Sequence, residues 1–262
     1  MAPAAGVAIT GMLVVAAAVS VVWTPADPLR MSIAGRLEGP SRDHPFGTDH
    51  YGRDVLARVM AGTVTSIAVG ILAVAVGAGV GVPLGVAGGY VGGLLDEILM
   101  RLVDAVQGFP AILSALLFSA VFRPGIVIST VAIGIAFIPG FARLARGGFL
   151  ELREREFVLA ASALGATDLR LIGRHIFPNS LSPLIVQATT GFPVAIVAEA
   201  ALAYLGLGTQ PPQPSWGLML KEAQNFLSLN PWFAVFPGSA IALAVLGLNL
   251  LGDGLRDVLA SR

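Results

Sequence analysis

The sequence predicts an all-α membrane protein with six transmembrane helices. Only 12% of its 262 residues are charged and 55% are hydrophobic, whereas a soluble domain carries about 25% charged residues. The charges are also unevenly distributed, because uncharged stretches occupy residues 3–26, 59–95, 105–122, 124–142, 176–198 and 223–252. A crossing of the bilayer takes about 20 mostly apolar residues. Each of these stretches is long enough, or nearly so, for one crossing.

The six helices are expected near residues 6–23, 65–90, 98–121, 125–145, 181–204 and 233–252. Polar segments at 24–62, 146–178 and 205–232 separate them, and the last contains a short helical stretch. The first apolar run has no basic segment before it and is long for a signal peptide, so we expect a retained helix. All three tryptophans, at 23, 216 and 232, fall near expected helix ends, as interfacial anchoring would place them.

Composition excludes several function classes. A net charge of zero gives no support for a nucleic-acid partner. The absence of cysteine removes disulfides and thiolate chemistry. His44, His50 and His175 are too few and too scattered to indicate a metal site. The sequence also lacks the GxxxxGK[ST] phosphate loop, so hydrolysis of ATP by that route is not expected of this chain.

A stripe of glycines follows the second expected helix at four-residue spacing: Gly77, Gly81, Gly85, Gly89 and Gly93. Residues at this spacing form one slowly winding groove without side chains, which lets another helix approach closely in lipid. The approaching helix belongs either to this chain or to a second membrane subunit. Pro83, in the middle of the stripe, indicates a kink.

The polar segment between the fourth and fifth helices predicts a helix, a glycine turn and a second helix. The stretch 151–164 reads as helical, and Gly165 stands where a helix end needs positive φ. Thr167 can cap the next helix, with Asp168 in its first turn. Leu169, Ile172 and Ile176 then recur at helical spacing, which places them on one face, and Pro178 ends that helix. Taken alone, the segment is also consistent with an amphipathic helix lying on the membrane.

Residues 157–178 (FVLAASALGATDLRLIGRHIFP) resemble the "EAA" loop of ATP-binding-cassette (ABC) importer permeases. The resemblance rests on Ala160, Ala161 and Gly165, with the sequence IFP downstream. It implies a coupling helix that docks in a cleft of a cytoplasmic ATPase subunit. The residues implied in this contact are Leu159, Ala160, Ala161, Ser162, Leu164, Gly165, Ala166, Asp168, Arg170 and Arg174. Leu159 departs from the family pattern, which usually has Glu there.

Three more motifs resemble the C-type permease of the dipeptide, oligopeptide and nickel importers. They are HPFGTDHYGRDVLAR at 44–58, DEILMRLVD at 96–104 followed by Phe109-Pro110, and EAALAYLGLG at 199–208 followed by PSWG at 214–217. The four motifs occur in the family's order over about residues 40–255. The resemblance implies a type I importer permease fold, with a first helix and external loop at 1–63 and a five-helix core at 64–262.

The resemblance implies a pathway subunit of an ATP-driven importer in a bacterial inner membrane, for dipeptides or oligopeptides. Nickel or another small solute is the alternative within the family. The implied partners are a homologous second permease, two ATPase subunits that bind ATP and Mg²⁺, an extracytoplasmic solute-binding protein and membrane lipid. No cofactor is expected in this chain. Segment 146–178 and both termini are expected in the cytoplasm. An ion-gradient transporter, which would need ionisable residues at mid-membrane, and a membrane scaffold are the rivals from other classes.

The remaining candidate residues lie outside the coupling loop. Gly77, Gly81, Gly85 and Gly89 are assigned to packing against the second permease. Arg53, Asp54 and Trp216 are assigned to contact with the binding protein, although Arg53 and Asp54 could instead cap a local helix. Glu199 lies about 30 Å along the helix from Pro178 at 1.5 Å per residue, near the outer surface, and is expected to brace the external loop or to act at a gate. Asp104 shares that assignment and is expected to pair with Arg101.

Overall fold

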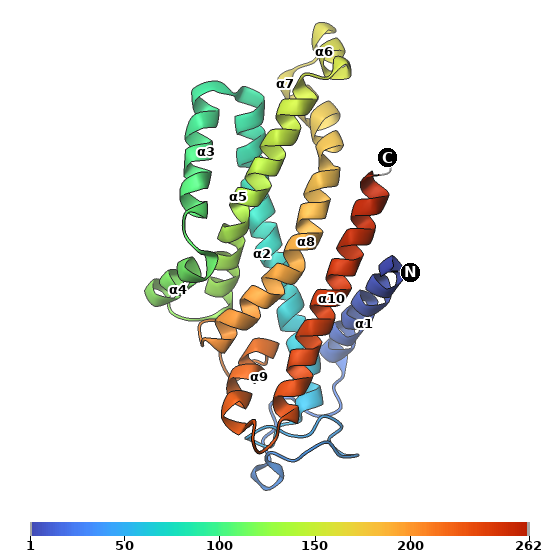
Figure 1. The fold of residues 1–262 in the computed structure, drawn as a ribbon, viewed down its shortest axis with the longest axis vertical. Coiled ribbons are helices and arrows are strands. Elements are labelled where there is room, and N and C mark those ends of the chain that lie inside the picture. Colours follow the sequence, from blue (N-terminus) through green and yellow to red (C-terminus); the bar gives the residue numbers. More distant parts are fainter. Residues whose placement is uncertain (1, 261–262) are drawn as a thin grey trace.

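The long apolar stretches form long helices in the structure, a computed structural model that describes residues 2–260 (Figure 1). Five helices of the described chain are long and apolar enough to cross a membrane. They are α1 (Ala2–Val22), α2 (Val55–Val91), α5 (Ile126–Arg153), α8 (Phe177–Tyr204), which continues the helical run that begins at Asp168, and α10 (Trp232–Ala260).

The expected third transmembrane helix is broken in two. Helix α3 (Gly93–Gln107) and helix α4 (Ala111–Phe122) are bent by 87° relative to each other. Pro110 lacks an N–H group and disfavours helical geometry at the residue before it, so the helix ends at Gln107. The prediction of one continuous helix over 98–121 is therefore wrong. A sixth crossing exists only if this bent pair counts as one span.

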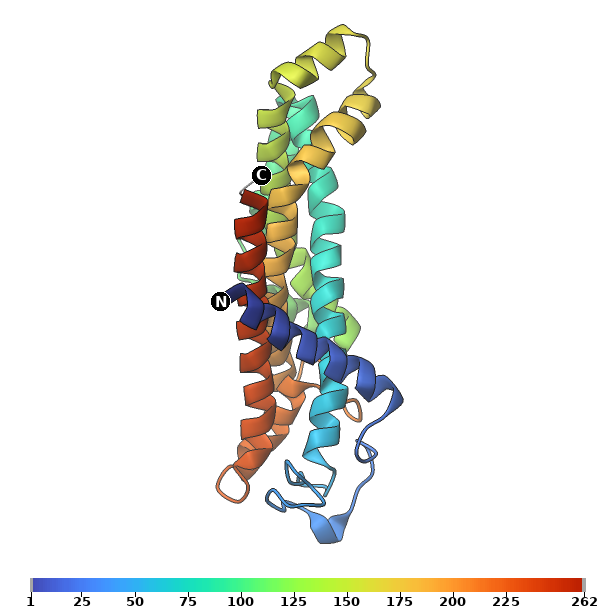
Figure 2. The ribbon, with the colours of Figure 1, turned by 90° about the vertical axis from the view of Figure 1, so that its right-hand side faces the viewer.

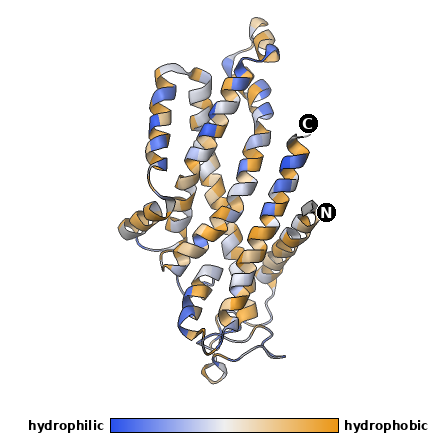
Figure 3. Cartoon of the chain, in the orientation of Figure 1, coloured by the Kyte–Doolittle hydropathy of each residue, from blue (hydrophilic) through white to orange (hydrophobic). Residues whose placement is uncertain are grey.

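The helices separate two polar ends of the bundle (Figures 1 and 3). The α6 end carries α6 (Glu156–Ala163), α7 (Asp168–Arg170), the π-helical segment η2 (Leu171–Ile176) and the α2–α3 connection. The α9 end carries the segment 23–54 with its short 3₁₀ helix η1 (Ile33–Gly35), α9 (Trp216–Ala223) and η3 (Gln224–Phe226). Helix α2 connects one end to the other.

Along α2 the glycine stripe is filled by α5 of the same chain, whereas its last member, Gly93, begins α3 and has no atom within 4 Å of an added Cβ. A Cβ added at Gly77 would lie 2.5 Å from the Cβ of Phe137, and one at Gly81 would lie 2.6 Å from the carbonyl oxygen of Ile138. Gly85 and Gly89 meet the backbone of α5 in the same way. The assignment of these four glycines to a second permease is therefore wrong. The stripe serves packing within the chain, because only a side-chain-free face admits α5 this closely.

Helix α1 lies across α10 and α2 on one side of the bundle (Figure 2). Two glycines permit the close crossing of α1 and α10. A Cβ at Gly6 would lie 2.6 Å from the backbone nitrogen of Leu251, and a Cβ at Gly247 would lie 2.6 Å from Cγ2 of Ile9. Helices from opposite ends of the sequence thus pack directly against each other.

Candidate functional site

Helix α6 ends in a glycine turn that fixes the direction of the chain. Gly165 has φ of +82°, a conformation that costs glycine little. Its N–H donates to the carbonyl of Ser162 at 2.9 Å, and the N–H of Ala166 donates to the carbonyl of Ala161 at 3.1 Å. These two bonds are those of a Schellman motif, which satisfies the last carbonyls of a helix. The predicted helix–glycine–helix geometry is present.

Most of the residues assigned to the coupling contact project from this turn into the surroundings. Leu164 is 89% exposed, Leu159 is 57% exposed and Leu169, just beyond the turn, is 84% exposed. The exposed members of the assigned set are Leu159, Ala160, Ser162, Leu164, Gly165, Asp168, Arg170 and Arg174, while Ala161 and Ala166 are half-buried. The surface is therefore apolar at its tip with cationic side chains along one flank.

Three local predictions for this segment need correction. Helix α5 continues to Arg153, and α6 begins separately at Glu156, so 151–164 is not one helix. The side chain of Thr167 makes no capping hydrogen bond. The chain from 171 to 176 is π-helical and leads into α8 without ending at Pro178.

The π-helical geometry changes which residues of this segment are buried. Because i→i+5 bonding brings positions five apart onto one side, Leu171 and Ile176 face the interior, at 5% and 0% exposure. Leu169, expected on the same face as Ile176, is exposed instead.

The inner side of the segment packs on a small apolar cluster. Val158, Leu171 and Ile176 are buried there against Phe149 of α5, and the ring of Tyr90 at the end of α2 packs on the same cluster. The Tyr90 hydroxyl donates to Oδ1 of Asp168 at 2.7 Å. Sequence patterns had not singled out Tyr90, because a lone tyrosine near a helix end carries no distinctive signal.

Ion pairs join α3 to α5 near the same end. Arg146 donates through Nε and Nη2 to both carboxylate oxygens of Asp96, each at 2.5 Å. Further along, Nη2 of Arg143 lies 3.5 Å from Oδ1 of Asp104. The expected pair of Asp104 with Arg101 is absent, since Arg101 pairs with Glu97 instead. Asp104 therefore links two helices, and neither it nor Arg143 is buried.

At the α9 end, the residues assigned to contact with a binding protein are buried. Arg53, Asp54 and Trp216 are 2%, 3% and 1% exposed. Oδ1 of Asp54 accepts from the N–H of Ala57 at 2.7 Å and caps α2. The indole Nε1 of Trp216 donates to the carbonyl of Val59 at 3.0 Å. In this conformation these three residues cannot form an external contact surface, and Trp216 is not an interfacial anchor.

A buried charge network surrounds Arg53. Asp49 accepts from Nε of Arg53 at 2.6 Å and from Nη1 of Arg58. Glu222 of α9 lies 2.8 Å from Nη1 of Arg58 and 3.2 Å from Nη2 of Arg53. Two carboxylates thus balance two guanidinium groups, which is the condition under which buried charges are tolerated. The network fixes segment 23–54 to α2 and α9.

Asp49, His50 and Glu222 place ligand atoms within 4.8 Å of one another, which would be close enough for a metal ion. Both carboxylates are however already paired with Arg53 and Arg58. A cation at this point would lie beside two guanidinium groups, so the donor set does not fit a metal. His50 stacks on Phe226 with centroids 5.1 Å apart, and burial is the largest influence on its pKa, which is lowered.

Glu199 lies at the far end of α8 with no exposed surface. Its Oε1 accepts from the hydroxyl of Thr209, in the loop before α9, at 3.0 Å. The loop is tightly packed here, because a Cβ at Gly208 would lie 2.8 Å from Cα of Ala203. Glu199 therefore joins α8 to the loop in the manner of a brace.

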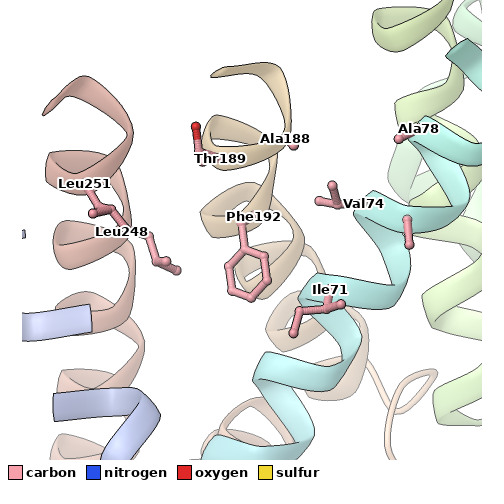
Figure 4. Close-up of a pocket in the computed structure, with 9 residues that line it drawn as sticks. Ile71, Val74, Ala78, Ala188, Thr189, Phe192, Leu248 and Leu251 are labelled. Carbon is pink, nitrogen blue, oxygen red and sulfur yellow. The ribbon is translucent and has the colours of Figure 1, made fainter. Parts of the chain in front are cut away.

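An apolar groove of about 350 Å³ lies between α2, α8 and α10 (Figure 4). It is lined by residues such as Val74, Phe192 and Leu248, and its only polar side chain is that of Thr189. The Thr189 hydroxyl is already bonded to the carbonyl of Val186 at 2.9 Å. The lining therefore offers no group that would pair with a charged or strongly polar ligand.

The structure defines a helical membrane protein with several apolar helices long enough to span a bilayer and an exposed helix–turn–helix segment at one end. The chain matches the family described as binding-protein-dependent transport system inner membrane component over residues 81–262. This match covers more than half of the chain, which therefore belongs to that family. Family membership excludes the rival readings as an ion-gradient transporter or a scaffold.

The chain is also similar to curated permease proteins. The chain is 43% identical over 226 residues to the dipeptide transport system permease protein of Alkalihalophilus pseudofirmus, covering 86% of this chain and 74% of the relative. It is 42% identical over 252 residues to a putative peptide transport system permease protein of Brucella suis, covering 96% and 85%. It is 46% identical over 221 residues to the glutathione transport system permease protein of Escherichia coli, covering 84% and 73%.

The fold is also that of a solved transporter. A chain of the MetNI methionine ABC transporter, in an inward-facing conformation, superposes with a TM-score of 0.62 at 16% identity. The match covers 77% of this chain and 95% of that chain. At this identity the likeness shows a shared fold, so the type I importer permease architecture is confirmed.

Proposed function

We propose that this chain forms half of the membrane pathway of an ATP-driven importer and that its substrates are dipeptides or oligopeptides. The coupling role rests on the exposed α6–Gly165–α7 segment. The hydrogen bonds of Gly165 and Ala166 fix its turn, its inner side packs on the cluster around Phe149, and its exposed surface carries Leu164 and Leu169. The substrate class rests on the relatives, which are named for dipeptide, peptide and glutathione transport. Nickel and other small solutes are the competing substrates.

The α6–Gly165–α7 segment would dock on an ATPase subunit. Exposed leucines of this size stabilise a complex when a partner buries them, at about 25 cal/mol per Å² of apolar surface. Leu159, in place of the acidic residue usual in the family, would add an apolar contact. Arg170 and Arg174 would face acidic groups of the partner. ATP and Mg²⁺ would be bound by the ATPase subunits, and this chain would supply no catalytic group.

This proposal places the α6 end in the cytoplasm of a bacterial cell and the α9 end on the opposite side of the inner membrane. Helix α1 runs toward the α9 end and α10 runs back toward the α6 end (Figure 1), which supports cytoplasmic termini. The solute-binding protein would deliver substrate to the α9 end. A homologous second permease would complete the pathway, and two ATPases would bind the two coupling segments.

Peptides carry charges that the apolar groove of Figure 4 cannot pair. The groove is therefore not assigned as the peptide site. The pathway would instead be formed where this chain faces the second permease.

The proposal is tested by co-purification with the cognate ATPases and by uptake into proteoliposomes. Wild-type chain should retain the ATPases, and the complete importer should accumulate a labelled dipeptide but not Ni²⁺. Leu164→Asp, at an 89% exposed position, should release the ATPases. Leu229→Asp is the matched control, because Leu229 is 70% exposed at the α9 end.

Equal retention of the ATPases by the two variants would overturn the docking assignment. Accumulation of Ni²⁺ without dipeptide would overturn the proposed substrate.

A further inference from the structure

The α6–α7 segment has covalent connections to α5 and α8 only, yet it is also bonded to α2. The bond from the Tyr90 hydroxyl to Asp168, 2.7 Å long, joins residues 78 apart in sequence. Within the described chain it is the only side-chain hydrogen bond between α2 and residues 154–176. Helix α2 therefore makes a specific polar contact with the α6–α7 segment, although the two are not adjacent in the sequence.

Tyr90 is held from a second direction. Nη1 of Arg153, the last residue of α5, donates to the backbone carbonyl of Tyr90 at 2.8 Å. That carbonyl is among the last four of α2, which have no partner within the helix. The Tyr90 ring packs on the cluster of Phe149, Val158 and Ile176. One residue thus connects the last turn of α2 to the end of α5 and to the first residue of α7.

Helix α2 continues from this point to the α9 end. Its glycine stripe meets α5 with almost no free space, so a displacement of one helix displaces the other. At the far end, Asp54 caps α2, Arg58 joins the buried charge network, and the carbonyl of Val59 accepts from Trp216. A force applied to Asp168 has a continuous path of contacts along α2 to the loop that contains α9.

We propose that Tyr90 is a positioning residue, whose hydroxyl bond to Asp168 makes α2 a third support of the coupling segment and passes its movement to the α9 end. The inference rests on the proposed function, since the movement originates when ATPases dock and close. In the absence of this bond, α5 and α8 would still hold the segment, but α2 would follow its movement less closely.

The test uses the complete importer in lipid nanodiscs, with ATP hydrolysis measured with and without substrate-loaded binding protein. Tyr90→Phe removes only the hydroxyl and keeps the ring in its cluster. We expect normal assembly, unchanged basal hydrolysis and a loss of stimulation of roughly threefold, within the range by which residues between two sites modulate their coupling. Tyr204→Phe is the matched control, because the Tyr204 hydroxyl makes a comparable 2.9 Å bond to Gln224 at the other end of the bundle.

A double-mutant cycle separates this role from a structural one. Asp168→Ala alone is expected to lower stimulation for several reasons, but adding Tyr90→Phe to it should cause no further loss, because the two residues act through one bond. A purely structural Tyr90 would instead lower assembly or melting temperature without changing the stimulation per assembled complex.

Stimulation in Tyr90→Phe equal to that in Tyr204→Phe would overturn the inference while leaving the proposed function intact. Additive losses in the cycle would overturn it as well. A wild-type complex without any stimulation would overturn the proposed function, and this inference with it.

Discussion

The two ends of the bundle differ in how their polar and apolar groups are satisfied. At the α9 end, Asp49, Arg53 and Arg58 are buried and paired within the chain. At the α6 end, Leu164 and Leu169 are almost fully exposed, and no ion pair forms at Arg170 or Arg174 among residues 2–260. The buried charges of the α9 end are thus paired within the chain, whereas the α6 end has the composition of a surface that a partner covers. This contrast separates residues that maintain the fold from residues that are available for contact with a partner subunit.

The largest effect is expected from breaking the network at the α9 end. Arg58→Ala removes a fully buried guanidinium that faces Asp49 and Glu222. Removing one partner from a buried charge network costs about 3–5 kcal/mol, because Arg53 alone would then face both Asp49 and Glu222 and one negative charge would lack a counter-charge. Thermal unfolding in detergent, followed by tryptophan fluorescence, should show a large decrease in melting temperature. Arg101→Ala is the control, since its pair with Glu97 is exposed and contributes about 1 kcal/mol or less. Equal decreases would remove the distinction between the two ends.

A smaller effect is expected where α2 joins the two ends. At Gly85, a Cβ would collide with the carbonyl oxygen of Ala142. Overpacking of this kind costs about 1–3 kcal/mol, so Gly85→Ala should lower the melting temperature. Gly79→Ala provides the comparison on the same helix, because no atom lies within 4 Å of a Cβ there. Alanine is a better helix former than glycine, and this control should be neutral or slightly stabilising. A stable Gly85→Ala variant would mean that α2 and α5 are not tightly joined.

At the α6 end, the expected effect falls on docking rather than on unfolding. A Cβ at Gly165 meets no atom within 4 Å, but φ of +82° is unfavourable for alanine. The penalty of about 1–2 kcal/mol should weaken ATPase binding roughly 5–30-fold in Gly165→Ala. Gly147→Ala in α5 also introduces a methyl group into open space, without positive φ, and should bind normally. The affinities of the two variants for immobilised ATPase test this prediction. Equal affinities of Gly165→Ala and Gly147→Ala would show that the turn does not position the docking surface.

The smallest effect concerns pH at the α9 end. Burial lowers the pKa of His50, against the opposing influence of Asp49 and Glu222. The unfolded chain therefore binds a proton at His50 more readily than the folded chain does. The contribution of neutral His50 to the free energy of unfolding is then fully present above about pH 6.5, the ordinary histidine pKa. This contribution is lost as the pH decreases toward the folded-state pKa. Melting temperatures at pH 7.5 and 5.5 should differ less in His50→Phe, which keeps the stacking on Phe226. An unchanged difference would assign the pH dependence to other groups.

The sequence predicted the features that depend on local patterns. Uncharged stretches located the long helices, and the glycine at 165 located the end of α6, because apolar length and positive φ are properties of short segments. The break between α3 and α4 was missed although Pro110 signals it, since the apolar run continues on both sides of the proline. The π-helical segment was missed because spacings of four and five residues are both compatible with Leu171, Ile172 and Ile176.

Contacts between distant residues were beyond the sequence patterns. Arg53 and Asp54 resemble a surface pair when read alone, and only the fold brings Glu222 to within 3.2 Å of Arg53. Asp104 has Arg101 one turn away, yet its partner Arg143 comes from another helix. A charged residue near the end of an apolar stretch is equally consistent with a solvent-exposed side chain and with a buried ion pair. The outcome depends on the packing of α2, α5 and α9, which no single segment encodes.

The crossing of α1 and α10 also bears on how the protein is made. Gly247 follows Gly6 by roughly 240 residues, so at about 5–20 residues per second α10 leaves the ribosome roughly 10–50 s after α1. During this interval α1 has no α10 to pack against. Its sequence contains no ionisable side chain, so the bilayer itself is an adequate solvent for it. Helix α10, made later than α1, is then the helix that closes the bundle over α1.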